Sequence, residues 1–128
     1  MNPPPAAAVL YAKDLSSVGN FYASVARLKI THEEADHLVL ESDAFQLVVV
    51  AIPARRAASI RITEPPQRRE NTAIKLVFPV ESLAAARQLA PLHGGGLNTA
   101  TREWMFQGMR VCDGHDPEGN VVQFRERA

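Results

Sequence analysis

Apolar residues in the first half of the chain follow the spacing of a strand, then of a helix, then of strands again. The apolar stretch Ala6–Ala12 predicts a strand, and the helical spacing of apolar residues over residues 16–26 predicts a helix with Asp14 as its N-cap. Three shorter strands, separated by polar residues, are predicted at Lys29–Glu33, His37–Glu41 and residues 45–52. This half of the chain therefore predicts a βαβββ unit.

The second half of the chain repeats this order of elements. A strand is predicted at residues 73–80, and Ser82 then caps an alanine-rich helix that runs to about Leu92 and ends at the glycine run 94–96. Further strands are predicted at residues 97–101, 104–112 and 121–125. Aligning Asp14 with Ser82 also aligns the alternating apolar residues of the two opening strands, which should pack beneath the helices. The repeat predicts one α+β domain over residues 1–128, made of two βαβββ modules at residues 6–52 and 72–126.

Residues 53–71, which join the two modules, are rich in proline and arginine. This composition is typical of a solvated linker. Five arginines also allow a second interpretation, an arm that contacts an anion or clasps a second chain: Arg55, Arg56, Arg61, Arg68 and Arg69. Within the segment, residues 59–63 alternate like an edge strand, which would suit an arm that pairs with a partner. The pattern is too short to separate the two interpretations.

Composition limits the classes of partner. The chain has 128 residues, of which 46% are hydrophobic, and this is enough for one domain with a buried core. Fourteen basic and fourteen acidic residues cancel, so neither nucleic acid nor a membrane is expected as a partner. The longest apolar run, residues 47–53, is too short to span a bilayer, and the first residues lack the features of a signal peptide. Together with a single cysteine, Cys112, expected to be a buried thiol, these features predict a cytoplasmic protein.

The end of the chain carries the most specific motif. Asp116-Pro117-Glu118-Gly119-Asn120 predicts a tight turn, because proline presets φ and glycine and asparagine tolerate positive φ, and the alternating residues after it predict a final strand. Turn and strand together resemble the closing motif of the vicinal oxygen chelate superfamily, which includes glyoxalases, bleomycin and fosfomycin resistance proteins and extradiol dioxygenases. The resemblance covers nearly the whole chain. It implies the glyoxalase/bleomycin resistance fold, in which each module curls its mixed sheet into a half-funnel, and a homodimer, because relatives pair modules across chains.

In that superfamily, His or Glu side chains on the inner faces of the first and last strands of each module hold a metal. The resemblance places the four ligand positions at Ala7, near Val48, at Lys75 and at Gln123. A methyl group has no lone pair, a protonated ammonium repels a cation, and an amide is a poorer ligand for a divalent metal than a carboxylate. No cofactor is therefore predicted, and a divalent metal held by atypical ligands is the alternative.

The four histidines show no recognisable metal spacing. The stretch from His32 to His37 is rich in acids, but it lies at a predicted hairpin, where charged side chains face water. Asp113 and His115 flank the final turn, and we expect them to cap it or to face solvent. The glycine run 94–96 follows a helix rather than opening one, so it is expected to end that helix and not to bind phosphate.

The resemblance also places eight side chains on the inner face of the funnel: Ala7, Val9, Tyr11, Lys75, Val77, Val121, Gln123 and Arg125. A mostly apolar set with a few polar groups is the usual composition of a small-molecule site. We hypothesise that Lys75 supplies the positive charge that a metal supplies in the relatives; a lysine that only reaches solvent from a strand end is the alternative. Tyr11 is expected to contact the ligand through its hydroxyl, whereas Trp104 and Phe106 are expected in the core rather than in a stacking platform.

Two functions from different classes follow from these positions. Non-ligating residues at all four metal positions favour a small-molecule binding protein of the bleomycin resistance type, with a degenerate, metal-free site and an anionic or aromatic ligand. The alternative is a glyoxalase- or dioxygenase-like enzyme, a lyase, isomerase or oxygenase, that uses atypical metal ligands or metal-free chemistry through Lys75 or Tyr11. The catalytic residues of such an enzyme remain unknown at this point.

Overall fold

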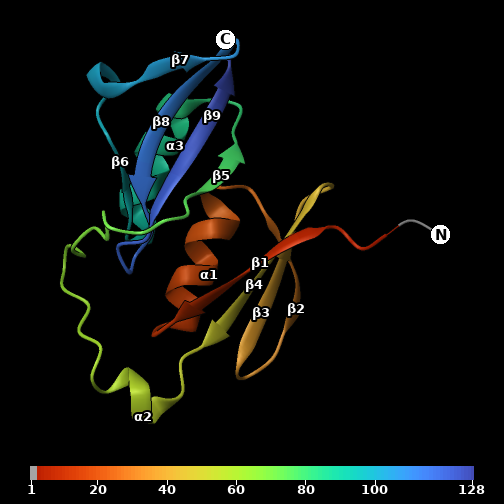
Figure 1. Ribbon diagram of the computed structural model, residues 1–128, viewed down its shortest axis with the longest axis vertical. Coiled ribbons are helices and arrows are strands. Elements are labelled where there is room, and N and C mark those ends of the chain that lie inside the picture. The colour runs from red at the N-terminus through yellow and green to blue at the C-terminus, as the bar shows by residue number, and fades with distance from the viewer. Residues whose placement is uncertain (1–2) are drawn as a thin grey trace.

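Two open mixed sheets, each with a helix against one face, make up the computed structural model, which describes residues 3–128 (Figure 1). The first sheet has the strand order β1-β4-β3-β2, with strands β1 (Ala6–Ala12), β2 (Lys29–Glu33), β3 (His37–Glu41) and β4 (Phe45–Ala51). Helix α1 (Leu15–Ser24) connects β1 to β2 and packs against β3 and β4. The strands and the helix of this half occur where the sequence predicted them.

The second sheet has the strand order β5-β9-β8-β6, and β7 also pairs with β8. Its strands are β5 (Leu76–Pro79), β6 (Gly96–Leu97), β7 (Trp104–Phe106), β8 (Met109–His115) and β9 (Val121–Arg127). Its helix α3 (Leu83–Leu89) continues into the 3₁₀ turn η1 (Ala90–His93), and a second 3₁₀ turn, η2 (Ala100–Arg102), precedes β7. The short helix α2 (Ala54–Ala57) lies in the segment that joins the halves. The α+β class is confirmed.

Both predicted helix caps are present. Asp14 Oδ1 accepts a hydrogen bond from the Ser17 amide at 3.0 Å, and Ser82 Oγ accepts one from the Ala85 amide at 3.1 Å. Gly94 follows η1 with a φ of 83°, so the glycine run ends the helical segment as predicted.

Several predicted strands are wrong in detail. The strand predicted at residues 73–80 covers only Leu76–Pro79, so Lys75 lies just before it. Residues 104–112 form a hairpin and not one strand, because Gln107 and Gly108 both take positive φ and turn the chain between β7 and β8. Residues 97–101 contribute only the two-residue strand β6 before the chain coils into η2. Residues 59–63 form no strand; this part of the linker is irregular in structure.

A single apolar core joins the two halves. Phe21 and Tyr22 of α1 are fully buried, and Tyr22 packs on Phe78 of β5 with ring centroids 5.6 Å apart. Phe78 also meets Phe45 of β4 at 5.9 Å and Phe124 of β9 at 6.5 Å. The helix-bearing faces of both sheets therefore pack into one hydrophobic cluster, and their other faces stay open. Within residues 3–128, no helix is long and apolar enough to cross a membrane.

Candidate functional site

The open face of the second sheet is set by the alternation of side chains along β8 and β9. Phe124 lies opposite Cys112, and both side chains are fully buried in the core beneath α3. The neighbouring pair, Gln123 and Asp113, therefore points to the other side of the sheet. Val77 lies opposite Gln123 on the parallel strand β5 and shares this face. The burial of Cys112 confirms the thiol's predicted environment.

Four polar side chains on this face form one connected network. Lys75 Nζ donates to Asp113 Oδ2 at 2.8 Å, and Gln123 Nε2 donates to Asp113 Oδ1 at 3.2 Å. Arg125 Nε donates to Gln123 Oε1 at 2.8 Å. A carboxylate on one side and a guanidinium on the other fix the orientation of the Gln123 amide, which is nearly buried. The network therefore holds Arg125 in a defined position.

Aromatic side chains continue this face beyond Arg125. The Arg125 guanidinium carbon lies 5.0 Å from the centroid of the Phe106 ring, within the range of a cation–π contact. Trp104 lies opposite Val111, which lies opposite Arg125, so its indole shares the same face. Trp104 is 41% exposed and Phe106 is 43% exposed. The prediction that these two aromatics belong to the core is wrong, because their side chains lie on the open face of the sheet, opposite to the buried Cys112 and Phe124.

The candidates from the first strand lie on the other sheet. Val9 is 57% exposed and Tyr11 is 63% exposed, and Ala7 of the same strand is exposed as well. Val9 and Val121 line an apolar cavity of about 390 Å³ between β1 and the β5–β9 pair. The structure therefore brings Lys75, Gln123 and Arg125 together with Val77, and it leaves Tyr11 apart from them.

Asp113 is the member of the network that sequence reasoning missed. The prediction that it caps the final turn or faces solvent is wrong: the cap is Asp116, whose Oδ1 accepts from the Glu118 amide at 2.9 Å and from the Asn120 amide at 3.0 Å. The predicted strand ended at Cys112, three residues before β8 ends at His115. An unbroken alternation from Val111 to Asp113 opposite the last strand was the signal that could have placed Asp113 beside Gln123.

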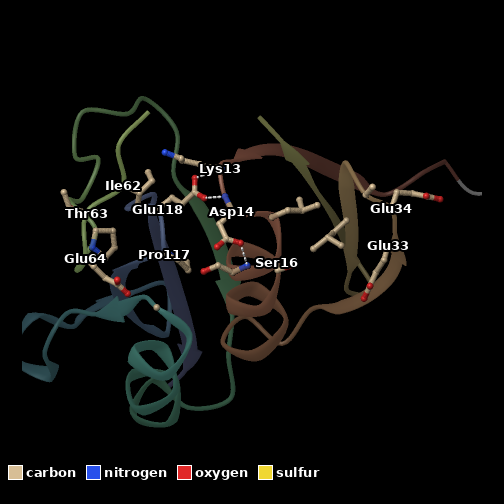
Figure 2. Close-up of a pocket in the computed structure, with 16 residues that line it drawn as sticks. Lys13, Asp14, Ser16, Glu33, Glu34, Ile62, Thr63, Glu64, Pro117 and Glu118 are labelled. Atoms are coloured by element: carbon tan, nitrogen blue, oxygen red, sulfur yellow. Dashed lines mark hydrogen bonds between the residues drawn. The ribbon is translucent and has the colours of Figure 1, made fainter. Parts of the chain in front are cut away.

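A larger cavity, of about 760 Å³, lies at the N-terminal end of α1 (Figure 2). Figure 2 shows Asp14 and Ser16 of this helix facing Glu118 of the final turn and Glu64 of the linker, with Glu33 and Glu34 of the β2–β3 hairpin at the far side. Two carboxylates of this cavity, those of Asp14 and Glu118, already accept hydrogen bonds from backbone amides. Asp14 caps Ser17, and Glu118 accepts from the amides of Lys13 at 2.9 Å and Asp14 at 2.7 Å. This acidic cavity is therefore a poor receptor for an anionic ligand.

The histidines take no part in the hydrogen bonds of the network. His32 pairs with Glu34 and His37 with Asp36 in exposed positions of the β2–β3 hairpin, as predicted for a solvated loop. His115 is half-buried with its Nδ1 lacking a hydrogen-bond partner, so the prediction that it caps the turn or faces solvent is wrong. Desolvation, and then the positive charge of Arg68, lower the pKa of His115. Within residues 3–128, no group of three His, Cys, Asp or Glu side chains could hold a metal ion.

Comparison with solved structures identifies the fold. A glyoxalase/bleomycin resistance protein/dioxygenase family enzyme from Burkholderia phytofirmans matches with a TM-score of 0.69 at 15% identity, over 96% of this chain and 98% of that one. The chain has the glyoxalase/bleomycin resistance fold. A bleomycin resistance determinant encoded on transposon Tn5 shares the fold with a TM-score of 0.59 at 15% identity, over 98% of both chains. A genomically encoded fosfomycin resistance protein from Listeria monocytogenes shares it with a TM-score of 0.66 at 13% identity, over 100% of this chain and 96% of that one.

No protein-family model and no curated protein matches the sequence. The shared feature is therefore the glyoxalase/bleomycin resistance fold itself, and one fold of this kind supports many functions.

The residues at the four positions implied by the resemblance do not fit a divalent metal in this glyoxalase/bleomycin resistance fold. Ala7 and Val48 carry no donor atom. The ammonium of Lys75 is hydrogen-bonded to Asp113. Gln123 could ligate only through Oε1, and that atom accepts the hydrogen bond of Arg125 Nε. The side chains at these four positions therefore offer no donor set that suits a divalent metal.

Proposed function

We propose that the protein is a small-molecule binding protein of the bleomycin resistance type, which holds an anionic aromatic ligand on the open face of the second sheet. The site has no resident metal in this proposal, and the protein carries out no reaction on the ligand. The observation that supports the proposal is the position of Arg125, a guanidinium fixed by Gln123 on one side and set over the ring of Phe106 on the other.

The charge on this face differs from the distribution that the sequence suggested. Lys75 forms an ion pair with Asp113, so the two charges largely offset each other. Arg125 forms no ion pair with a carboxylate among residues 3–128, and its single hydrogen bond uses Nε alone. Its terminal nitrogens are therefore free to donate to a carboxylate or phenolate oxygen. Lys75 acts in this arrangement by holding Asp113, which in turn orients Gln123.

The residues beside Arg125 favour a ligand with an aromatic part. Trp104 and Phe106 expose large apolar surfaces on the same face, and exposed aromatics of this size are unusual without a partner. An aromatic ring placed against either side chain would gain both apolar burial and an edge or stacking contact. A benzoate-like molecule, with its carboxylate on Arg125 and its ring on Trp104 or Phe106, satisfies both features.

A thermal-shift and calorimetric titration with benzoate and with uncharged benzamide tests the proposal. Benzoate should raise the melting temperature in a concentration-dependent way and benzamide should not. Arg125→Gln should weaken benzoate binding by at least about tenfold, because it removes a charge-assisted hydrogen bond. Arg110→Gln is the matched control, because Arg110 lies on the opposite face of β8 and makes no contact with the network.

Three outcomes would overturn the proposal. Equal stabilisation by benzamide, or benzoate binding that Arg125→Gln leaves unchanged, would remove Arg125 from the site. The enzyme alternative would be favoured if the purified protein held about one metal ion per chain and a divalent metal stabilised it independently of Arg125.

A further inference from the structure

The arginine-rich segment between the two modules encloses a cavity of about 560 Å³ that shares no residue with the network around Arg125. The cavity lies between the segment and the final turn. Most of its lining side chains are basic or neutral and polar: Arg61, Ile62, Thr63, Gln67, Arg68, Arg69, Glu70, Asn71, Thr72 and Glu118.

Hydrogen bonds hold the segment against the final turn although it forms no strand or helix there. The Arg69 amide donates to the Gly119 carbonyl at 2.8 Å, and Arg69 Nε donates to the Glu118 carbonyl at 3.2 Å. Arg68 Nη1 donates to Asn98 Oδ1 at 2.5 Å. Gly119 fits because it has no Cβ, which would lie only 2.0 Å from the Gln67 carbonyl oxygen. Arg68 and Arg69 are therefore carried by a backbone that is fixed against the final turn.

The charges around this cavity leave guanidinium groups without carboxylate partners. Both oxygens of Glu118 accept hydrogen bonds from the backbone amides of Lys13 and Asp14, on the side of the acidic cavity. Glu70 lies 3.1 Å from Arg68 Nε but is 68% exposed, so this pair is weak and can open. Among residues 3–128, neither Arg61 nor Arg69 forms an ion pair with a carboxylate. The cavity therefore presents two guanidinium groups that are not engaged in an ion pair.

The two cavities that flank Ile62 and Thr63 have opposite character. The one drawn in Figure 2 carries four carboxylates besides Glu118 and a single lysine, Lys13. The one on the other side carries three arginines and, besides the shared Glu118, a single carboxylate, Glu70. An anion that approaches this part of the surface is therefore repelled by one cavity and attracted by the other.

We propose that this second cavity binds the phosphoryl group of a small phosphorylated molecule, through the guanidinium groups of Arg61 and Arg69. A guanidinium presents paired N–H donors that match the oxygens of a phosphoryl group. A phosphoryl group has enough terminal oxygens to accept from both arginines at once, and the side chains of Asn71 and Thr72 offer neutral donors beside them. A carboxylate, with two oxygens, would leave part of this donor set unused.

Thermal-shift and calorimetric titrations of the intact chain with inorganic phosphate test the site, with chloride at matched ionic strength as the reference. Phosphate should raise the melting temperature beyond the effect of chloride. Arg61→Gln and Arg69→Gln should each weaken phosphate binding by about tenfold. Arg55→Gln, in α2 of the same segment but outside the cavity, should leave it unchanged. Arg110→Gln should also leave it unchanged, because that residue lies outside both sites.

The proposal fails if chloride stabilises the protein as much as phosphate does, or if Arg55→Gln weakens phosphate binding as much as Arg61→Gln does. Arg69→Gln also removes a hydrogen bond to the final turn, so this variant can fail to fold for reasons unrelated to phosphate. Arg61→Gln removes no side-chain hydrogen bond among residues 3–128, and it therefore tests the site even if the Arg69 variant does not fold. Glycerol phosphate should bind at least as tightly as inorganic phosphate; binding that is tenfold weaker would overturn the assignment to a phosphorylated molecule.

Discussion

Asp116 shows how one residue of the closing motif connects the two halves of the molecule. Its carboxylate is fully buried and accepts from the Tyr22 hydroxyl at 2.8 Å, from the Glu118 and Asn120 amides, and from Asn120 Nδ2 at 2.8 Å. A buried carboxylate with this many donors is satisfied without a metal or a lysine. Burial, and then the charge of Asp116, raise the pKa of Tyr22 well above its ordinary value of 10.0. The motif is thus a structural joint between α1 and the last turn.

At the scale of this residue, we expect Tyr22→Phe to lower the free energy of unfolding by about 1–3 kcal/mol, because Asp116 loses a donor in a buried site. Folding favours the protonated phenol, so the stability that it contributes is present below pH 10 and is lost as the pH rises through the raised folded pKa. The alkaline part of this loss should be absent in the variant. Urea unfolding at neutral and alkaline pH measures both effects.

Tyr11→Phe is the control for this change, because the Tyr11 hydroxyl is exposed and has no hydrogen-bond partner among residues 3–128. It should alter stability by less than about 0.5 kcal/mol. If both substitutions lower the free energy of unfolding by the same amount, the hydrogen bond between Tyr22 and Asp116 does not stabilise the fold.

Two tight turns decide how the elements of the second half are placed. Gly108 turns β7 back along β8 with a φ of 76°, and nothing lies within 4 Å of the position that its Cβ would occupy. Gly119 has a φ of 85°, and its Cβ would meet the backbone oxygen of Gln67. Both turns need a residue that tolerates positive φ, but only the second also needs the absence of a side chain.

Comparing Gly119→Ala with Gly108→Ala separates these two requirements. Gly108→Ala should cost about 1–2 kcal/mol, the strain of an L-residue in the left-handed region. Gly119→Ala should cost more by at least about 1 kcal/mol, because either the linker or the turn has to move. Chemical denaturation of both variants measures the difference. Equal costs would mean that the linker yields freely, which would also weaken the case for a fixed phosphate site beside it.

At the scale of the whole molecule, the open faces of the two sheets leave apolar side chains in contact with solvent. Val9 and Tyr11 on the first sheet and Val77, Trp104 and Phe106 on the second are all substantially exposed. Surfaces of this kind on a folded protein commonly mark an interface or a ligand site. The resemblance to the vicinal oxygen chelate superfamily implies pairing of modules across two chains, and we propose that a second copy covers the first sheet's share of this surface.

We therefore expect a homodimer in sedimentation velocity at micromolar concentration. Tyr11→Glu should shift the protein toward a monomer, because it places a charge in the apolar surface that the partner would cover. Leu92→Glu is the matched control, since Leu92 is similarly exposed but lies in η1, outside the open faces of the sheets, and it should leave the assembly unchanged. A single species of monomer mass for the unmodified chain would contradict the expectation.

The sequence by itself determined the order of strands and helices, the two helix caps and the closing turn. These features depend on local chemistry: side chains at Asp14 and Ser82 that accept from nearby amides, and glycines where φ is positive. It missed the β7–β8 hairpin because glutamine rarely takes positive φ, so Gln107 gives no turn signal in the sequence. It also identified Lys75, Gln123 and Arg125 as neighbours through the resemblance.

Only the tertiary structure decided what those neighbours do. Asp113 reaches Lys75 across 38 positions of sequence and Gln123 across 10, and no local pattern shows that it neutralises the lysine and leaves Arg125 as the available cation. The same holds for the linker, whose composition is that of a solvated chain but whose backbone is fixed by the final turn. Charge partners in a sheet are set by strand register, and register depends on contacts between segments distant in sequence.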